Sequence, residues 1–347
     1  MPRTGDQLAV VSQSGPTVTL FDAVDHGVRT VLTLPAEPHE LLFDAEHRML
    51  FCTSTYHAGY YDANDGRNHL LTVIDPDAGR IVEVLDLSPE HGPHGLALDP
   101  ARRLLYVSVE AGPAGPGGVV VVDTETRRVV RRIDTLAPGP HWFAIGPDGV
   151  LGYASNKEAP YITVVELATG VLVDKIAVPG GEGISVSPDG SMVAVAAPKA
   201  AHAGEPGKEP GVRLIDTRTG TIVRTLPTER AVIPVHWTST GLLLAGELGP
   251  NGVVFEQSDQ PDGRLVVWAG PSPASVEPVG SVSVGSCPIT CASAPDGERA
   301  YLAGIFSSTV SVVDLTVPTT PTVLETLTIP RAKQAGAHGL AYIPATA

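Results

Sequence analysis

Residues 94–110 read HGLALDPARRLLYVSVE, and residues 119–135 read VVVVDTETRRVVRRIDT. Each stretch holds two apolar runs separated by a short polar turn, which is the pattern of an antiparallel β-hairpin. Read in succession, the two stretches predict one unit of four antiparallel strands.

This unit recurs along the chain. The second hairpin is found at residues 18–34, 71–87, 119–135, 162–178, 212–228, 265–284 and 310–329, with the sixth copy degenerate. The first hairpin precedes most of these copies, for example as HWFAIGPDGVLGYASNK from residue 141. Four-stranded units repeated around an axis form a β-propeller. No segment has a sustained helical period, so we expect almost no helix.

The two ends of the chain fit together as one unit. Units begin near residues 39, 94, 141, 182, 235, 289 and 338. Residues 338–347 suffice for one strand, and residues 1–38 supply three strands without a first one. The N-terminal strands therefore complete the last unit and close a ring. We predict an all-β fold, a single seven-bladed β-propeller domain over residues 1–347 with four-stranded antiparallel blades.

These repeats resemble the YVTN-repeat propellers, a broad group that includes YncE-like and lactonase-like seven-bladed proteins. The resemblance lies in HGLALDP and LLYVS, in SPDG followed by VAV, and in the hairpins VVVVDTET and RLIDTRTG. It covers the whole chain and implies the same fold. Propellers host many unrelated activities, so the function has to be argued from the site.

Composition excludes several classes of partner. The chain of 347 residues has a formal net charge of −15, which opposes binding to nucleic acid or to an anionic membrane. It has no apolar run of about 18 residues that could span a membrane. Residues 1–10 lack the pattern of a secretory signal, so we expect a cytoplasmic protein. Its three cysteines fit a reduced state, with Cys287 and Cys291 in the core.

One position of the repeat carries chemistry in five adjacent units. Where the first strand of the unit begins, the innermost of the blade, the chain has His39, His94, His141, Glu182 and His338. Imidazoles that converge on one point are good ligands for Zn, Fe, Cu or Ni. We predict one divalent transition metal ion bound by these five residues. The alternative is a structural histidine that the repeat has duplicated. Unit 6 has Ile289 at this position, and in unit 5 we expect Val235 or His236.

Further candidates follow the second strand of the unit, on the same side of the ring. Glu110, Glu158 and Glu247 are candidates for orienting an imidazole or for acid–base catalysis, as is Glu182. For any one of them, the alternative is a solvated loop charge. Tyr56 and His57 are further candidates for catalysis, and they open a long aromatic insertion over residues 56–70. Long insertions also occupy residues 199–210 and 248–263, which marks this face as the binding face.

These features predict a metal-dependent enzyme that acts on a small organic metabolite at the mouth of the propeller. The ion would support Lewis-acid lyase, cyclase or hydrolase chemistry. One alternative is a redox metalloenzyme, since the four histidines resemble the iron ligands of carotenoid-cleaving oxygenases and the copper-binding propeller mouth of nitrous oxide reductase. Another is a non-catalytic binding propeller. The sequence contains no P-loop, G-x-S-x-G or H-E-x-x-H motif, which would have indicated another class of enzyme.

Overall fold

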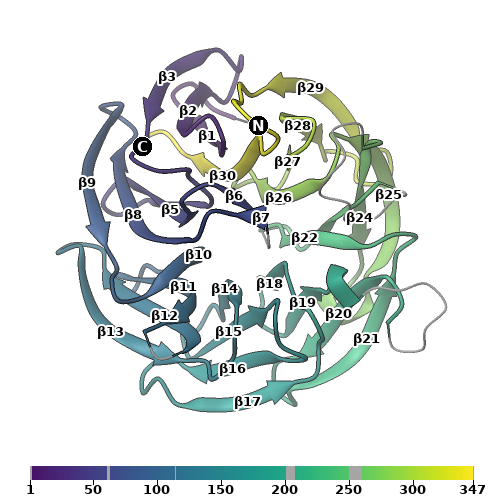
Figure 1. Ribbon diagram of the computed structural model, residues 1–347. Helices are drawn as coiled ribbons and strands as arrows, with labels where there is room; N and C mark the ends of the chain where they lie inside the picture. Colours follow the sequence, from purple (N-terminus) through teal and green to yellow (C-terminus); the bar gives the residue numbers. More distant parts are fainter. Residues whose placement is uncertain (1, 61–62, 114, 201–207, 250–259, 347) are drawn as a thin grey trace.

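The computed structural model describes residues 2–60, 63–113, 115–200, 208–249 and 260–346. These residues form seven four-stranded antiparallel sheets in a ring (Figure 1), which confirms the predicted seven-bladed propeller. The helices of the described residues are two short 3-10 turns, η1 (Pro198–Ala200) and η2 (Pro273–Ser275). Neither turn approaches the length that a membrane-spanning helix needs.

We number the blades from the first complete sheet and give each one from its inner to its outer strand. Blade 1 holds β4 (Leu41–Asp44), β5 (Met49–Tyr56), β8 (Arg67–Asp75) and β9 (Arg80–Asp86), with the hairpin β6 (Gly59–Tyr60) and β7 (Ala63–Asn64) inserted before β8. Blade 2 holds β10 (His91–Asp99), β11 (Leu104–Gly112), β12 (Gly115–Asp123) and β13 (Arg128–Asp134). Blade 3 holds β14 (Pro140–Ile145), β15 (Leu151–Asn156), β16 (Ile162–Glu166) and β17 (Leu172–Ile176).

The remaining blades follow the same order. Blade 4 holds β18 (Ile184–Val186), β19 (Met192–Ala196), β20 (Gly211–Asp216) and β21 (Thr221–Pro227). Blade 5 holds β22 (Val232–Trp237), β23 (Leu243–Glu247), β24 (Gly263–Ala269) and β25 (Glu277–Val284). Blade 6 holds β26 (Pro288–Ser293), β27 (Arg299–Gly304), β28 (Thr309–Asp314) and β29 (Thr322–Thr328). Blade 7 holds β30 (Ala337–Ile343), β1 (Gln7–Ser12), β2 (Thr17–Asp22) and β3 (Val28–Thr33).

Blade 7 closes the ring as predicted, because its inner strand comes from the C-terminal part of the chain and the other three come from the N-terminal part. β1 pairs with β30 in antiparallel register, with Ala9 opposite Ala341 and Val10 opposite Leu340. The pairing continues past the strands, where the amide of Ser14 donates to the carbonyl of Ala335 at 3.0 Å. This seam leaves the inner edge of β1 paired and so removes a sheet edge that could aggregate.

The core lies between neighbouring blades, and this explains the uninterrupted valine run in β12. Val119 and Val121 pack toward blade 3, where they meet Phe143 and Val165. Val120 and Val122 point the other way and pack against residues of blade 1 such as Phe51 and Leu71. A central strand with both faces buried is apolar throughout, because successive side chains point to opposite faces.

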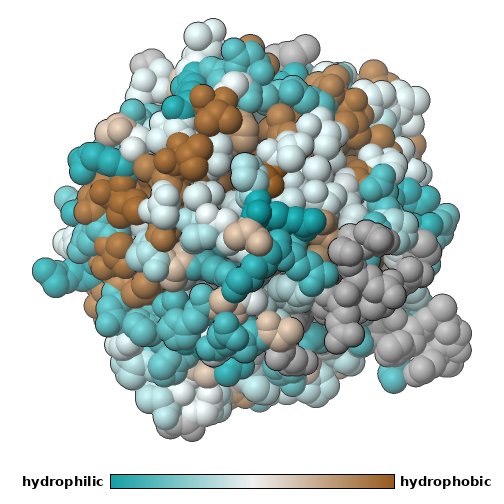
Figure 2. All heavy atoms as spheres, turned by 45° about the horizontal axis from the view of Figure 1, so that its top comes forward, coloured by the Kyte–Doolittle hydropathy of each residue, from teal (hydrophilic) through white to brown (hydrophobic). Residues whose placement is uncertain are grey.

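The outermost strands end this packing, and their outward residues face solvent. Single valines such as Val31, Val130 and Val173 are exposed there. On the face that Figure 2 presents, hydrophobic residues lie in several groups between polar ones.

Removing the closing strands should unfold the ring. Deletion of residues 1–38 takes away β1, β2 and β3, and leaves β30 with an unpaired edge. We expect the truncated protein to aggregate or to lose its cooperative melting transition, measured by circular dichroism and size-exclusion chromatography. Deletion of residues 1–4, which precede β1, is the control and should melt like the full chain. A soluble, cooperatively melting 39–347 fragment would show that the seam is dispensable.

Candidate functional site

The inner strands meet closely at one end of the ring, and glycine makes the approach possible. Gly95, Gly183 and Gly339 each follow a candidate site residue. A Cβ on Gly183 would lie 2.2 Å from the carbonyl oxygen of Ile233, and one on Gly339 would lie 2.5 Å from that of His39. The amide of Gly339 donates to this His39 oxygen at 2.9 Å. Neighbouring blades are therefore linked directly at the site.

Hydroxyl groups on the second strands fix the same backbone. Thr53 Oγ1 accepts from the Glu40 amide in its own blade and donates to the His94 carbonyl in the next. Ser108 Oγ likewise accepts from the Gly95 amide and donates to the His141 carbonyl at 2.5 Å. Each hydroxyl holds the backbone of a histidine in the following blade.

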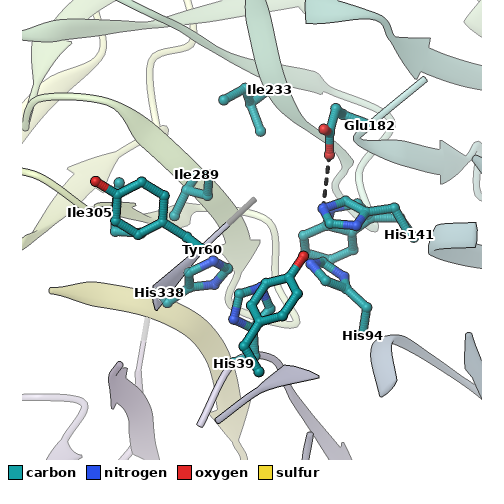
Figure 3. Close-up of a pocket in the computed structure, with 11 residues that line it drawn as sticks. His39, Tyr60, His94, His141, Glu182, Ile233, Ile289, Ile305 and His338 are labelled. Carbon is teal, nitrogen blue, oxygen red and sulfur yellow. Dashed lines mark ion pairs between the residues drawn. The ribbon is translucent and has the colours of Figure 1, made fainter. Parts of the chain in front are cut away.

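The structure brings all four predicted histidines together in a buried arc. His39, His94, His141 and His338 are 4%, 1%, 5% and 3% exposed. Their rings are in contact, with centroid separations of 4.0 Å for His39 and His338, 4.5 Å for His39 and His94, and 3.5 Å for His94 and His141 (Figure 3). Four imidazoles this close cannot all carry charge.

At one end of the arc, a carboxylate that the sequence analysis overlooked joins two histidines. His39, Glu40 and His338 each offer a ligand atom, and these atoms lie within 4.8 Å of one another. The Nδ1 atom of His338 is 3.0 Å from Oε1 of Glu40. Burial raises the pKa of Glu40, and the neighbouring His338 opposes this rise. Both histidines and Glu40 are types of ligand that a divalent transition metal accepts.

At the other end, His141 lies between two carboxylates. Its Nε2 atom is 3.0 Å from Oε2 of Glu182, and its Nδ1 atom is 3.3 Å from Oε1 of Glu110. Burial by itself lowers the pKa of His141, but the two carboxylates outweigh it and the pKa is raised above the ordinary value of 6.5. A ring with both nitrogens facing carboxylates is suited to hold a proton.

In the middle of the arc, the pKa of the imidazoles shifts in the opposite direction. Burial, reinforced by the neighbouring imidazoles, holds the pKa of His39 and of His94 well below 6.5. Both rings are therefore neutral at physiological pH, which is the form that binds metal.

Behind His141 lies a buried ionic network centred on Glu110. The Glu110 carboxylate accepts hydrogen bonds from Tyr56 Oη at 2.9 Å, from Arg67 Nε at 2.9 Å and from Lys157 Nζ. Lys157 also donates to Tyr56 Oη at 2.8 Å. Burial alone would raise the pKa of Glu110, but His141 and Lys157 outweigh it and hold the pKa well below 4.5. The network fixes Tyr56 and one side of His141.

A recess at the mouth of the ring is lined by this arc. It encloses about 390 Å³, solvent included, of which about 20 Å³ can take the centre of a water molecule or ion. Within the described part of the chain, Nδ1 of His94 has no hydrogen-bond partner, and Nδ1 of His338 and Oε1 of Glu40 face each other at 3.0 Å. Leaving a buried group such as the His94 nitrogen unsatisfied costs about 1–3 kcal/mol. The donor set and the space therefore fit a single bound metal ion.

Four predicted catalytic residues do not line this recess. Glu110 lies behind His141. Glu158 is exposed and pairs with Lys199 at 2.9 Å, and His57 is exposed beside Asn68. Glu247 is buried, but it accepts from Arg264 at 2.7 Å near the outside of blade 5. The position after a second strand therefore does not decide whether a glutamate reaches the site, and of these three glutamates only Glu110 contacts a histidine of the arc.

In blade 5, neither residue that we expected at the mouth, Val235 or His236, lines the recess. Ile233 lines the recess, while His236 points away and lies 2.8 Å from Ser293 Oγ. The pairing of β22 with β23 changes register after Val232, as blades 2 and 3 do after Pro93 and Pro140, so Ile233 is equivalent to His94 and His141. In blade 6, Ile289 lines the recess as expected, and Cys287 is buried in the core. Most of the predicted 248–263 insertion lies outside the described residues.

Several residues of the site were missed in the sequence analysis: Glu40, Tyr60, Arg67, Trp142, Lys157, Ile233 and Ile305. Glu40 and Trp142 directly follow His39 and His141 in sequence, and this adjacency was the available signal. Lys157 adjoins Glu158 in sequence, but only the lysine is buried, and it donates to Glu110. Tyr60 belongs to the aromatic insertion after β5, and the sequence predicted the insertion but no particular role for Tyr60.

Comparison with known proteins establishes the fold alone. No protein-family model matches the sequence, and no curated protein does. Among solved structures, a functionally unknown protein from Desulfotomaculum acetoxidans DSM 771 superposes with a TM-score of 0.73 at 13% identity, covering 98% of this chain and 99% of that one. A candidate 6-phosphogluconolactonase from Bacteroides uniformis ATCC 8492 gives 0.71 at 13% identity, covering 98% and 100%. Hydrazine synthase of Kuenenia stuttgartiensis gives 0.70 at 20% identity, covering 88% and 91%.

Breaking the Glu110 network should destabilise the protein strongly. In Lys157→Met, a buried carboxylate loses its closest cation, and we expect a loss of about 3 kcal/mol in the free energy of unfolding, measured by urea denaturation at pH 7. The control is Lys199→Met, because its pair with Glu158 has side chains 32% and 40% exposed and should contribute less than about 1 kcal/mol.

The same variant should change the response to acid. Because the pKa of Glu110 is lower in the folded state, its contribution is complete above about pH 4.5 and is lost as the pH falls below that value. Lys157→Met should therefore lose less stability than the wild type between pH 5 and pH 3. An equal loss in both proteins would mean that Lys157 does not stabilise the charged carboxylate.

Proposed function

We propose that this propeller is a metal-dependent enzyme that acts on a small organic molecule at its mouth. The observation that carries the proposal is the buried arc of four imidazoles, in which His39, Glu40 and His338 bring three ligand atoms within 4.8 Å of one another. A binding module without a metal would leave the neighbouring Nδ1 atom of His94 buried without a partner.

The ligands of the ion would come from the His39 end of the arc. His39, Glu40 and His338 form the compact group, and the neutral ring of His94 lies next to His39. This proposal keeps three of the four histidines of the sequence-based ligand set and replaces Glu182 by Glu40. A bound ion would supply Lewis acidity, which suits lyase, cyclase or hydrolase reactions on carbonyl compounds. The likeness to a candidate lactonase is compatible with hydrolysis.

The other end of the arc would handle the proton. His141 can give or take one at Nε2, with Glu182 at 3.0 Å to stabilise the charged ring. Glu110, held by Lys157 and Arg67, keeps the opposite side of the ring in place. Tyr56 also lines the recess, and its hydroxyl is committed to Glu110, so it shapes the site rather than donating to substrate.

Metal analysis tests the proposal directly. Protein purified anaerobically should contain close to one equivalent of a divalent transition metal by mass spectrometry, and His39→Ala should lose it. The control is His236→Ala, a buried histidine outside the recess, which should keep the metal. Zinc would favour the Lewis-acid reading, and iron or copper the redox alternative. A folded protein that neither contains metal nor takes it up would leave the binding-module function.

A second variant separates ligands from proton-handling groups. His141→Gln should retain the metal, because its ring nitrogens face Glu182 and Glu110 rather than the His39 group. Its turnover should fall by about 100-fold or more once a substrate is found, as for loss of a general acid or base. If His141→Gln released the metal as His39→Ala does, His141 would be a ligand, as the sequence pattern first suggested.

A further inference from the structure

The recess has a second wall of different chemistry. Ile233 and Ile289 occupy in blades 5 and 6 the inner-strand position that carries histidine in blades 7, 1, 2 and 3. Ile305 and Tyr60 complete this wall, and all four face the histidine arc across the recess (Figure 3). The repeat therefore does not require histidine at this position, and the ring is divided into an imidazole side and an aliphatic side.

The aliphatic side is held in a fixed arrangement. The carbonyl of Ile233 accepts from Gly183 at 3.1 Å, and the carbonyl of Ile305 accepts from Gly336 at 2.9 Å. The ring of Tyr60 packs against Phe306 with centroids 6.1 Å apart, and its hydroxyl donates to Gln334 at 2.7 Å. A surface constructed in this way can recognise shape, because its side chains do not have to be ordered when a ligand binds.

The charges around the recess argue against a phosphorylated ligand. Among the described lining residues there is no lysine or arginine. Lys157 and Arg67 lie outside this lining, and both donate to Glu110. Glu182 adds a carboxylate to the lining, and Glu40 adds another next to His338. A phosphate group would therefore find no ammonium or guanidinium donor in this lining and would depend on the bound ion and on His141, whereas phosphate sites normally supply several donors.

We propose that the substrate is a small unphosphorylated molecule with a polar, metal-binding head and a short aliphatic body that lies on Ile233, Ile289 and Ile305. This inference rests on the proposed function for the head group only. The aliphatic wall exists independently of the metal, and the two ideas can fail separately.

A series of ligands with one head and growing bodies tests the proposal. Acetohydroxamate, propionohydroxamate and butyrohydroxamate share a metal-chelating head and differ by single methylene groups. Each methylene buried on the wall should tighten binding about threefold, so the butyryl compound should bind about tenfold more tightly than the acetyl compound. Binding is measured by calorimetry on metal-loaded protein and by ligand-observed NMR on chelator-treated protein. The gain per methylene should persist after chelation, while overall affinity should drop.

Two variants locate the effect. Ile289→Ala removes part of the wall and should reduce the tenfold gain to less than threefold. Ile222→Ala, at an exposed isoleucine of the outer strand β21, is the matched control and should keep it. Comparison of gluconate with 6-phosphogluconate tests the charge argument, and we expect the phosphorylated compound to bind no more tightly.

The possible results separate the two ideas. Equal affinity for the three hydroxamates in both forms of the protein would overturn this inference, even if metal were bound. Tenfold tighter binding of 6-phosphogluconate would overturn it as well. If affinity rose with the length of the hydroxamate in a protein that never takes up metal, the aliphatic binding wall would be supported. The proposed metal-dependent function would then be wrong.

Discussion

The close contact of inner strands at the mouth of the ring is the constraint on which the site depends. Backbone atoms of adjacent blades approach closely enough to exclude a side chain at Gly183 and Gly339. The hydroxyls of Thr53 and Ser108 fasten the same segments from the second strands. Because these links run from blade to blade, each imidazole is positioned by two blades at once. Side chains from five blades thereby converge in a space that loops alone could not define so tightly.

That convergence creates an electrostatic problem, and the structure solves it differently at the two ends of the arc. Around Glu110, buried charges are balanced by partners within hydrogen-bonding distance. Around His39 and His94, charge is avoided by lowering the pKa of the imidazoles. A ring suited to hold a proton and two neutral rings thus lie side by side, because carboxylates face both nitrogens of His141. One residue type takes two protonation states within one arc.

The sequence was sufficient for the fold because a propeller repeats its pattern, and hairpin alternation, turns and closure all agree. It was also sufficient to place the histidines in one arc, since equivalent repeat positions are equivalent in space. It failed where one unit differs from most others. The turn after β22 lacks the proline on which most units align, so Val235 or His236 was expected where Ile233 lies, and side-chain direction separated Glu110 from Glu158 and Glu247. Glu40 was missed because its position is acidic in only one blade.

The seam in blade 7 has a consequence for the order of events in the cell. His39 leaves the ribosome early and His338 comes from β30, the strand that pairs with β1 to close the ring. The compact group of His39, Glu40 and His338 cannot exist on the nascent chain until nearly all of the repeat has been synthesised. Assembly of this group therefore reports completion of the ring, and a truncated or stalled chain cannot present it.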